Sequence, residues 1–483
     1  MASFNLVRNT RVFFTTNVGL LSGIANAVLA TGMLPANTVE LQVLDGYSFK
    51  QGTQTANIQL KEAGDTPVRG QRTFNTSLDP VDFSFSTYVR PTTLSSKATA
   101  EEKVLWNALT SAVNIDTTGV TIGGTITGIT RPDTASATAT IAGTGMTYAG
   151  LSAGDYTTLA GASGAAGVAY EWNQPVKIIS LSATAIVLQY LNAPSVAAGT
   201  TTTLGATVKL FKGALVEQPA VSPTPTHSIT SFAGSNKNQL QPFGLIFVVD
   251  GTVWIVDNCA MDQVVLDFGL DAIATLAWTG KGTQLRQLSS TEASLSGITF
   301  TGTALAGTVT PKNTSAQYIT NKLSTVSLVS NIAGISGTSY QIALTGGSIT
   351  FANGVTYITP ANLGVVNTAI GYFTGTRAIS GTMTAYLRTG TNTTAQLLTD
   401  ILASSSTATD TRFRLQFEIG GRNNATRIEI EMDGAMLQVP TVETADVIST
   451  TIAFTAQSTT SSTAAPDYDI ENTNDATIRY YSA

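Results

Sequence analysis

Hydrophobic and polar residues alternate along much of the chain, which is the pattern of strands with one face in a core. The clearest example is 427–432, where isoleucine and methionine alternate with arginine and glutamate. Segments 57–61 and 82–86 have the same period. Residue pairs typical of tight turns occur at Asp45-Gly46, Asp250-Gly251, Asn353-Gly354 and Asp433-Gly434. The pattern predicts a mostly antiparallel β fold.

Two short segments have the spacing of amphipathic helices instead. Segment 101–109 begins with two glutamates, where the helix dipole favours acidic side chains. The apolar stripes of the two predicted helices are Val104, Leu105, Ala108 and Leu109 in 101–109, and Leu397, Leu398, Ile401 and Leu402 in 394–402. Both stripes are predicted to pack in a core.

The chain repeats itself after about 300 residues. The matching segments are 44–49 with 344–349, 85–90 with 383–388, 243–247 with 413–417, and 276–279 with 452–455. The first two pairs are 300 and 298 residues apart, whereas the last two are 170 and 176 apart. The fall from 298 to 176 predicts about 122 extra residues inside the first copy.

The fold class predicted from this repeat is all-β dominated, with two duplicated antiparallel β-sandwiches, each with one helix, and an inserted small β domain. The insert is dense in Thr, Gly and Ala and ends in a Pro/Thr-rich linker. The predicted boundaries are 1–115 with 241–285 for the first sandwich, 116–240 for the insert, 286–457 for the second sandwich, and 458–483 for a C-terminal arm that packs on a neighbour.

Composition argues against several classes of function. Only 12% of the 483 residues are charged and the net charge is −6, so tight binding of nucleic acid is not expected. The chain has one cysteine, Cys259, and one histidine, His227, which leaves no disulfide framework, cysteine zinc site or convincing catalytic triad. We expect no cofactor, no metal and no enzymatic activity. We also expect no membrane span and no signal peptide.

Several stretches in both copies, in this order, carry a family resemblance: 6–13, 62–70, 72–78, 83–91, 105–109, 345–347, 384–387 and 439–447. With them the chain resembles the tail tube (major tail) proteins of long-tailed, non-contractile bacteriophages, in the subgroup whose subunit carries two tube domains. Some relatives carry an extra module at the C-terminus, whereas this chain has its extra module in the middle.

The resemblance implies a structural virion protein of the tail, made in the host cytoplasm. Three subunits would form a pseudo-hexameric ring whose strands join edge to edge, and rings would stack into a hollow tube. Duplex DNA would pass through the lumen without tight binding. A tape-measure protein and a tail terminator would be partners, and the insert would contact host-surface glycans.

Two sets of residues are candidates for roles in such a tube. An acidic lumen would repel phosphates within about 8 Å of the wall. The candidate lumen residues are Asp257, Asp262, Asp267, Glu429, Glu431 and Asp433. The alternative for these acids is a solvated outer surface. The candidate inter-ring residues are Glu62, Asp65, Arg69 and Arg72, and the alternative for them is an ordinary hairpin loop.

Other functions fit a Thr/Gly-rich β protein. A surface adhesin or carbohydrate-binding protein is one alternative, and a tail-fibre depolymerase is another. The internal duplication and the absence of a secretion signal favour the tube.

Overall fold

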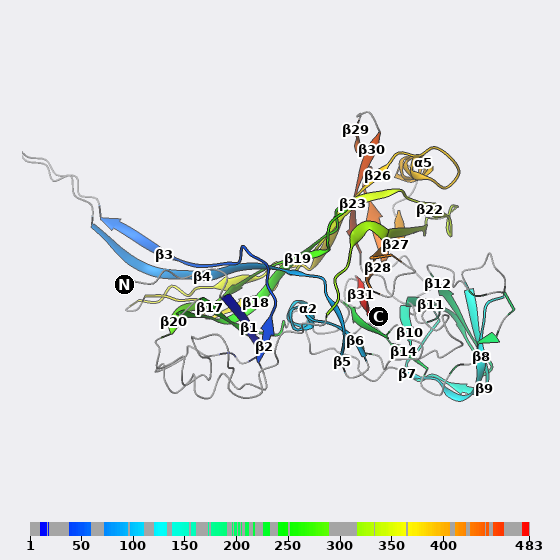
Figure 1. Ribbon diagram of the computed structural model, residues 1–483, viewed down its shortest axis with the longest axis horizontal. Helices are drawn as coiled ribbons and strands as arrows, with labels where there is room; N and C mark the ends of the chain where they lie inside the picture. Colours follow the sequence, from blue (N-terminus) through cyan, green and yellow to red (C-terminus); the bar gives the residue numbers. More distant parts are fainter. Residues whose placement is uncertain are drawn as a thin grey trace, which may run out of the picture.

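The computed structural model describes the parts of the chain that carry the β-structure and two helices. These are residues 10–16, 18, 38–58, 72–94, 97–110, 120–132, 138–153, 156–160, 172, 175–190, 196, 198–199, 201–202, 204, 208–211, 216–217, 226–231, 240–249, 252–288, 316–332, 334–363, 366–405, 411–421, 426–439, 441–443, 448–457 and 476–482. All strand pairings between named strands are antiparallel, so the predicted fold class is confirmed (Figure 1).

Most strands of the largest sheet divide into two sets, which we call copy one and copy two. Copy one contains β1 (Thr10–Thr15), β2 (Thr38–Leu41), β3 (Ser48–Ile58), β4 (Arg72–Tyr88), β17 (Phe243–Val249), β18 (Thr252–Asp267), β19 (Thr275–Gly282) and β20 (Gln284–Leu288). Copy two contains β21 (Thr325–Ser330), β22 (Ser339–Gln341), β23 (Leu344–Ala352), β26 (Ala378–Tyr386), β27 (Arg412–Ile419), β28 (Arg427–Leu437), β29 (Thr441–Glu443), β30 (Ser449–Ala456) and β31 (Thr477–Ser482). β31 of copy two lies in the part of the sequence predicted to be the C-terminal arm.

Copy two repeats the pairing of copy one strand by strand. In copy one, β3, β4, β19 and β18 are successive neighbours, and β18 continues through β17 and β1 to β2. In copy two, the same places are taken by β23, β26, β30 and β28, and then by β27, β21 and β22. β20 lies beside β18 as β31 lies beside β28.

The registers test the predicted offsets. Ser48 faces Ser84 in copy one and Ser348 faces Thr382 in copy two, so the offsets of 300 and 298 are confirmed. The offset of 176 for the last pair of segments is wrong. Phe85 faces Trp278, whereas its equivalent Met383 faces Ile452, 174 residues after Trp278.

The offset is 298 before the insert and 174 after it, so copy one contains 124 extra residues. A slip of two residues keeps every side chain on the same face of a strand, which is why the hydrophobic pattern did not reveal it.

Both copies have a register shift at the same place in an equivalent strand, β18 in copy one and β28 in copy two. The register between β17 and β18 shifts around Asp257-Asn258, and that between β27 and β28 shifts around Asp433-Gly434. The turn predicted at Asp433-Gly434 is thus wrong, because these residues form a β-bulge inside β28. Gly46 and Gly354 have the left-handed φ that their predicted turns require, 96° and 61°. Asp250-Gly251 lies outside the described residues.

The two copies share one hydrophobic core. The C-terminal half of β18 pairs with β23, which joins copy one to copy two within a single sheet. Helix α2 (Lys103–Thr110) fills this joint. Its Trp106 ring lies edge-on to Trp278 of copy one, at 5.1 Å, and to Phe351 of copy two, at 5.6 Å. Buried residues of both copies therefore belong to one continuous cluster.

The two predicted helices differ in burial. In α2 the predicted residues Leu105, Ala108 and Leu109 are buried, and so is Trp106, which was not predicted. In α5 (Thr394–Ser405) Leu397 and Ile401 are buried, but Leu402 is 55% exposed. The predicted inner stripe is thus confirmed for α2, apart from the half-buried Val104, and only in part for α5.

Eight strands between positions 120 and 211 form a separate sheet with its own core around Trp172 and Tyr190 (Figure 1). Its strands are β7 (Val120–Thr121), β8 (Gly123–Thr130), β9 (Thr138–Thr147), β10 (Tyr156–Ala160), β11 (Pro175–Leu181), β12 (Ala185–Tyr190), β13 (Thr201–Thr202) and β14 (Lys209–Phe211). This sheet lies inside the predicted insert.

The remaining described elements are β5 (Pro91–Leu94), β6 (Lys97–Ala100), β15 (Val216–Glu217), β16 (Thr226–Ser231), β24 (Thr356–Ile358), β25 (Gly371–Phe373) and the 3-10 helix η4 (Asn321–Leu323). They include two small two-stranded sheets, β5–β6 and β24–β25. β16 belongs to the predicted insert by sequence but pairs with β31. β31 lies between β16 and β28, so the described end of the predicted C-terminal arm is a strand in the sheet of its own chain.

Candidate assembly surfaces

The strands that join the two copies form what we call the long sheet, in the order β3, β4, β19, β18, β23, β26, β30 and β29. One face of the long sheet carries large buried side chains such as Phe85, Trp278 and Phe351. Residues of the opposite face are half-buried or exposed, and most are serine or threonine. We call this the hydroxyl face; it includes Ser84, Ser86, Thr275, Thr279, Ser348, Thr350, Ser380, Thr382, Thr384, Ser449, Thr451 and Thr455.

Hydroxyl groups bridge neighbouring strands across this face. Ser48 and Ser84 are 2.8 Å apart between β3 and β4, and their equivalents Ser348 and Thr382 are 3.4 Å apart between β23 and β26. Such cross-strand pairs stabilise a sheet without placing charge on its surface. The hydroxyl face can therefore be wetted by water over most of its area. Its charged group at the β3–β4–β19 end is Asp82, which lies between Lys50 and Lys281 at 3.8 and 3.6 Å and offsets one of their charges.

The predicted lumen acids lie in different environments. Asp267 is exposed at the end of β18, on the hydroxyl face. Asp262 is half-buried and accepts a hydrogen bond from the backbone N–H of Val355 at 2.7 Å. Asp257 is buried and accepts from the N–H of Asn258 at 2.8 Å, inside the bulge. The side chain of Asp433 lies outside the described residues.

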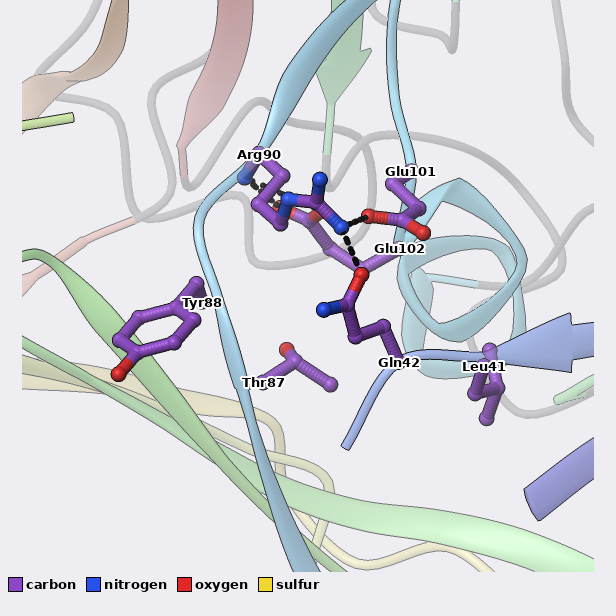
Figure 2. Close-up of a pocket in the computed structure, with 7 residues that line it drawn as sticks. All are labelled: Leu41, Gln42, Thr87, Tyr88, Arg90, Glu101 and Glu102. Carbon is purple, nitrogen blue, oxygen red and sulfur yellow. Dashed lines mark hydrogen bonds and ion pairs between the residues drawn. The ribbon is translucent and has the colours of Figure 1, made fainter. Parts of the chain in front are cut away.

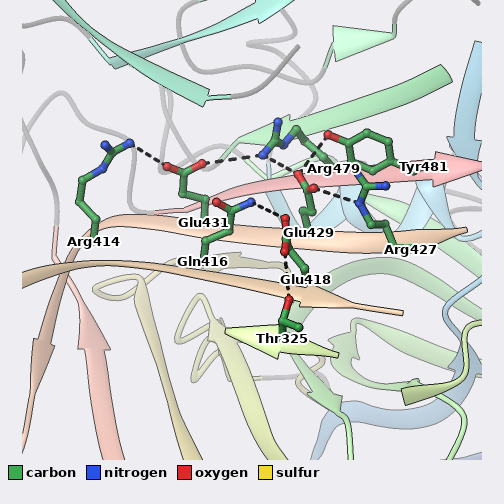
Figure 3. Close-up of polar contacts among 9 residues, drawn as sticks. All are labelled: Thr325, Arg414, Gln416, Glu418, Arg427, Glu429, Glu431, Arg479 and Tyr481. Carbon is green, nitrogen blue, oxygen red and sulfur yellow. Dashed lines mark hydrogen bonds and ion pairs between the residues drawn. The ribbon is translucent and has the colours of Figure 1, made fainter. Parts of the chain in front are cut away.

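Glu429 and Glu431 are both buried on β28, so the solvated face predicted for them is wrong (Figure 3). Glu431 pairs with Arg414 on β27 at 2.9 Å. Glu429 pairs with Arg427 at 3.0 Å and with Arg479 of β31 at 2.5 Å. Alternation in the sequence reports two faces of a strand, but it cannot tell whether the charged face is covered by partners of opposite charge.

This buried charge cluster fixes the last strand of the chain in register. Burial alone would raise the pKa of Glu429, but the charges of Arg479 and Arg427 outweigh it and hold the pKa below its usual range. Tyr481 donates a hydrogen bond to Glu429 at 3.1 Å. A shifted β31 would leave these charges buried without partners, which is strongly unfavourable.

A second polar group lies where copy one meets the end of the chain (Figure 2). Arg90 donates to Gln42 and Glu101, and its guanidinium lies 4.8 Å from the ring centre of Tyr318. The space beside them is about 10 Å³, room for about one water molecule. It is too small for an organic ligand. The contacts of Arg90 instead connect the segments that carry Gln42, Glu101 and Tyr318.

Glu102, beside this space, links α2 to β31. The hydroxyl of Tyr480 donates to Glu102 at 2.6 Å and accepts from the indole N–H of Trp106 at 2.7 Å. Burial raises the pKa of Glu102 from 4.5 to about 7, and the hydrogen bond from Tyr480 opposes that rise. The sequence placed this acid at a favourable helix start; the structure places it in the core before the first turn of α2.

Of the predicted inter-ring residues, Arg72 begins β4 and is exposed. Glu62, Asp65 and Arg69 lie outside the described residues. Figure 1 shows the β3–β4 hairpin projecting well beyond the body of copy one. Such a projection presents side chains at a distance from the core of its own subunit.

A set of exposed apolar residues close to this hairpin was not predicted. We call it the arm patch; it consists of Phe74 on β4 and Ile358, Leu363, Val366, Ile370 and Phe373 in the β24–β25 region, each at least 47% exposed. Asn367 connects the two parts, since the N–H of Leu78 donates to its carbonyl oxygen at 2.8 Å. The only signal in the sequence is a scatter of large apolar residues over 358–373 without strand alternation.

The described residues contain no group of three or more His, Cys, Asp and Glu side chains arranged to hold a metal ion. Cys259 is buried, and burial raises the pKa of its thiol. Among the same residues, no helix has the length and hydrophobicity needed to cross a bilayer.

Comparison with known proteins identifies a relative that matches nearly the whole chain. No protein-family model matches the chain. A curated relative, the tail tube protein pb6 of Escherichia phage T5, is 24% identical over 460 residues, which cover 94% of this chain and 73% of the relative. The similarity spans both copies and the insert, so it does not rest on a single β module. This similarity over nearly the whole chain supports the assignment to the siphophage tail tube proteins, which are structural components of the virion tail.

Proposed function

We propose that three copies of the chain close into a ring and that these rings stack into a hollow tube that conducts the genome. One observation carries the proposal: copies one and two already share a sheet, joined edge to edge through β18 and β23. The long sheet then ends in β3 on one side and in β29 on the other. Repeating the same joint between chains continues the sheet until it closes on itself.

Closure explains why such edges are tolerated. An open strand edge in a monomer is a template for aggregation, whereas a closed ring uses every edge. Three chains supply six copies, which gives pseudo-sixfold symmetry. Joining two copies covalently also removes part of the entropy that association costs, several kcal/mol per joined pair.

The hydroxyl face supports a role as the lumen wall. A wall of lysine and arginine would bind phosphates and slow the passage of DNA. Serine and threonine carry no charge, and an exposed acid such as Asp267 repels phosphate within about 8 Å. Among the acids proposed for the lumen, Asp267 is the one whose exposure suits the role best, since Glu429 and Glu431 are paired with arginines inside the chain.

The projecting β3–β4 hairpin and the arm patch support a role in stacking. Head-to-tail contacts between rings do not close, so they extend into a tube. Apolar residues exposed near the hairpin can be buried against the next ring, and Arg72 can meet an acid there. Arg69 belongs to the same proposal. Replacing Arg69 and Arg72 with alanine should shorten the tubes while ring-sized species stay soluble; unchanged tube length would reject this role for them.

Other partners follow from the same function. A tape-measure protein would set the length of the tube and a terminator would cap it. The sheet over 120–211, added to copy one, would lie outside the tube and contact glycans of the host surface. The protein would be made in the host cytoplasm and assembled there, and as a structural component it would have no catalytic role.

Negative-stain electron microscopy of the purified chain tests the proposal. Rings with a central hole, and tubes built from them, are the expected result. Isolated globules or stalks at every concentration would contradict it and would favour an adhesin or a carbohydrate-binding protein instead.

A further inference from the structure

The joint between the two copies provides a detailed template. β18 pairs antiparallel with β23 from Gln263 opposite Ala352 to Asp267 opposite Ser348. On its other side, the same segment of β18 pairs with β19, where Asp267 faces Thr275. One segment of copy one thus has two neighbours, one of its own copy and one of the next.

The corresponding segment of copy two is β29, and in the described part of the chain it has a neighbour of its own copy, β30, but none from another copy. Glu443 on β29 faces Ser449 on β30. Glu443 follows Asp267 by 176 positions, the offset that the equivalent bulges give between β18 and β28. Ser449 follows Thr275 by 174 positions, the offset that the registers give between β19 and β30. In the described part of the chain β29 pairs with β30 alone, and β3, the counterpart of β23, pairs with β4 alone.

The helices show the same difference between a filled and an open joint. Helix α2 packs against copy two: the carbonyl oxygen of Leu109 accepts a hydrogen bond from Asn353 at 2.9 Å, and the side chain of Leu109 is buried. The residue that matches Leu109 in the apolar stripe of α5 is Leu402, which is 55% exposed. Leu109 of copy one lies beside Asn353, which directly follows β23. The equivalent place beside Leu402 would be taken by the counterpart of β23, which is β3.

We propose that β29 of one chain pairs antiparallel with β3 of the next chain, with Glu443 opposite Ser48 and Val439 opposite Gly52. The neighbouring chain also covers the exposed side of α5 near Leu402. This inference rests on the proposed ring, and it adds which strands meet and in which register. The partner is therefore a second copy of this chain, because only β3 repeats the position of β23.

Engineered disulfides test the register. In a Cys259→Ala background, cysteines replace Ser48 and Glu443. Directly opposed residues of an antiparallel pair have Cα atoms about 4.5–5.5 Å apart, within the range that a disulfide spans. Oxidation should link separate chains, and a non-reducing gel should show covalent species of two and three chains and nothing larger.

Two variants control for folding and for register. Asp267→Cys with Ser348→Cys places the same pair inside one chain, so it should close without changing the number of chains linked. Lys50→Cys with Glu443→Cys is displaced by two residues, about 7–8 Å apart, and should link at least tenfold less. Closure of the internal pair with no linkage between chains by the Ser48 and Glu443 pair would overturn the proposal.

Microscopy of the same samples separates this proposal from the proposed function. Rings that form without the predicted linkage would overturn the register and leave the tube function standing. Absence of rings in the unsubstituted protein would count against the function itself.

A substitution in α5 provides a readout without cysteines. Leu402→Ser should shift the protein toward monomers in size-exclusion chromatography, whereas Ile179→Ser, which changes a 44% exposed residue of the separate sheet, should not. Equal elution profiles for the two variants would contradict the role of α5 in the contact between chains.

Discussion

The hydroxyl of Tyr480 donates a hydrogen bond of 2.6 Å to Glu102, two residues that are 378 positions apart. This contact ties the last strand of the chain to the helix at the joint between the two copies. Because α2 also packs on Trp278 and Phe351, the end of the chain, copy one and copy two meet at one place. The position of β31 thus depends on both copies being folded.

Glu102 should make the stability of the protein depend on pH. Its pKa is raised from 4.5 to about 7, so the folded protein holds this proton more tightly than the unfolded chain does. Stability should therefore be greatest below pH 4.5 as far as this group is concerned, and should fall as pH rises to about 7, by up to about 3 kcal/mol.

Glu102→Gln removes this dependence, because glutamine cannot ionise and can still accept from Tyr480. Urea unfolding at pH 5 and pH 8 should show a smaller difference between the two pH values for Glu102→Gln than for the unsubstituted protein. Asp271→Asn, at an exposed carboxylate, is the control and should leave the difference unchanged. Equal pH dependence in Glu102→Gln and the unsubstituted protein would refute the assignment.

The buried charge cluster should matter more than an exposed ion pair. Arg479→Met leaves Glu429 and Glu431 short of a partner and should lower the free energy of unfolding by about 3–5 kcal/mol. Lys322→Ala removes an exposed pair with Asp271 and should cost less than about 1 kcal/mol. Adding Glu429→Gln to Arg479→Met should recover part of the loss in urea titrations. Similar small losses for both single variants would show that the cluster does not hold β31.

A glycine and a phenylalanine exchange places between the copies. Phe83 on β4 lies over Gly280 on β19, whereas in copy two Phe454 on β30 lies over Gly381 on β26. A β-carbon at Gly381 would clash with the Phe454 ring and with the carbonyl oxygen of Ser348.

Gly381→Ala should therefore destabilise the protein by about 1–3 kcal/mol, measured by urea unfolding. Gly371→Ala is the matched control, since a β-carbon there meets nothing within 4 Å. If Gly381→Ala were as stable as Gly371→Ala, the close packing of this ring on the sheet would be disproved.

The arm patch should act in stacking and not in ring formation. Leu363→Ser combined with Ile370→Ser removes two of its most exposed apolar residues, 102% and 67% exposed. We expect rings of normal size and a several-fold loss of tube length in negative-stain images, while Ile179→Ser should leave tube length unchanged. Tubes of normal length from the double variant would exclude the arm patch from the contact between rings.

Much of the fold could be predicted because it depends on local patterns. Period-two alternation located strands such as β4 and β28, and the offsets of 300 and 298 matched the observed registers of β3 with β4 and of β23 with β26. The two helices were also located. These features repeat in the sequence because each copy buries the same faces.

What the sequence did not reveal depends on partners that are distant along the chain. Glu429 and Glu431 correspond to the buried aliphatic residues Val253 and Ile255 of copy one, so repeat logic alone could not predict a charged core there. Their burial requires Arg479, which comes from the end of the chain. The two-residue slip of β30 and the exposure of Leu402 are likewise set by pairing between strands and copies, which alternation does not record.

The decisive measurement is a reconstruction of the assembled tube at a resolution that separates strands. It should show three chains per ring, an unbroken sheet around the lumen, and β3 of each chain beside β29 of its neighbour, with the hydroxyl face toward the centre. A lumen lined by subunits whose sheets do not pair across the chain boundary would contradict the proposed ring.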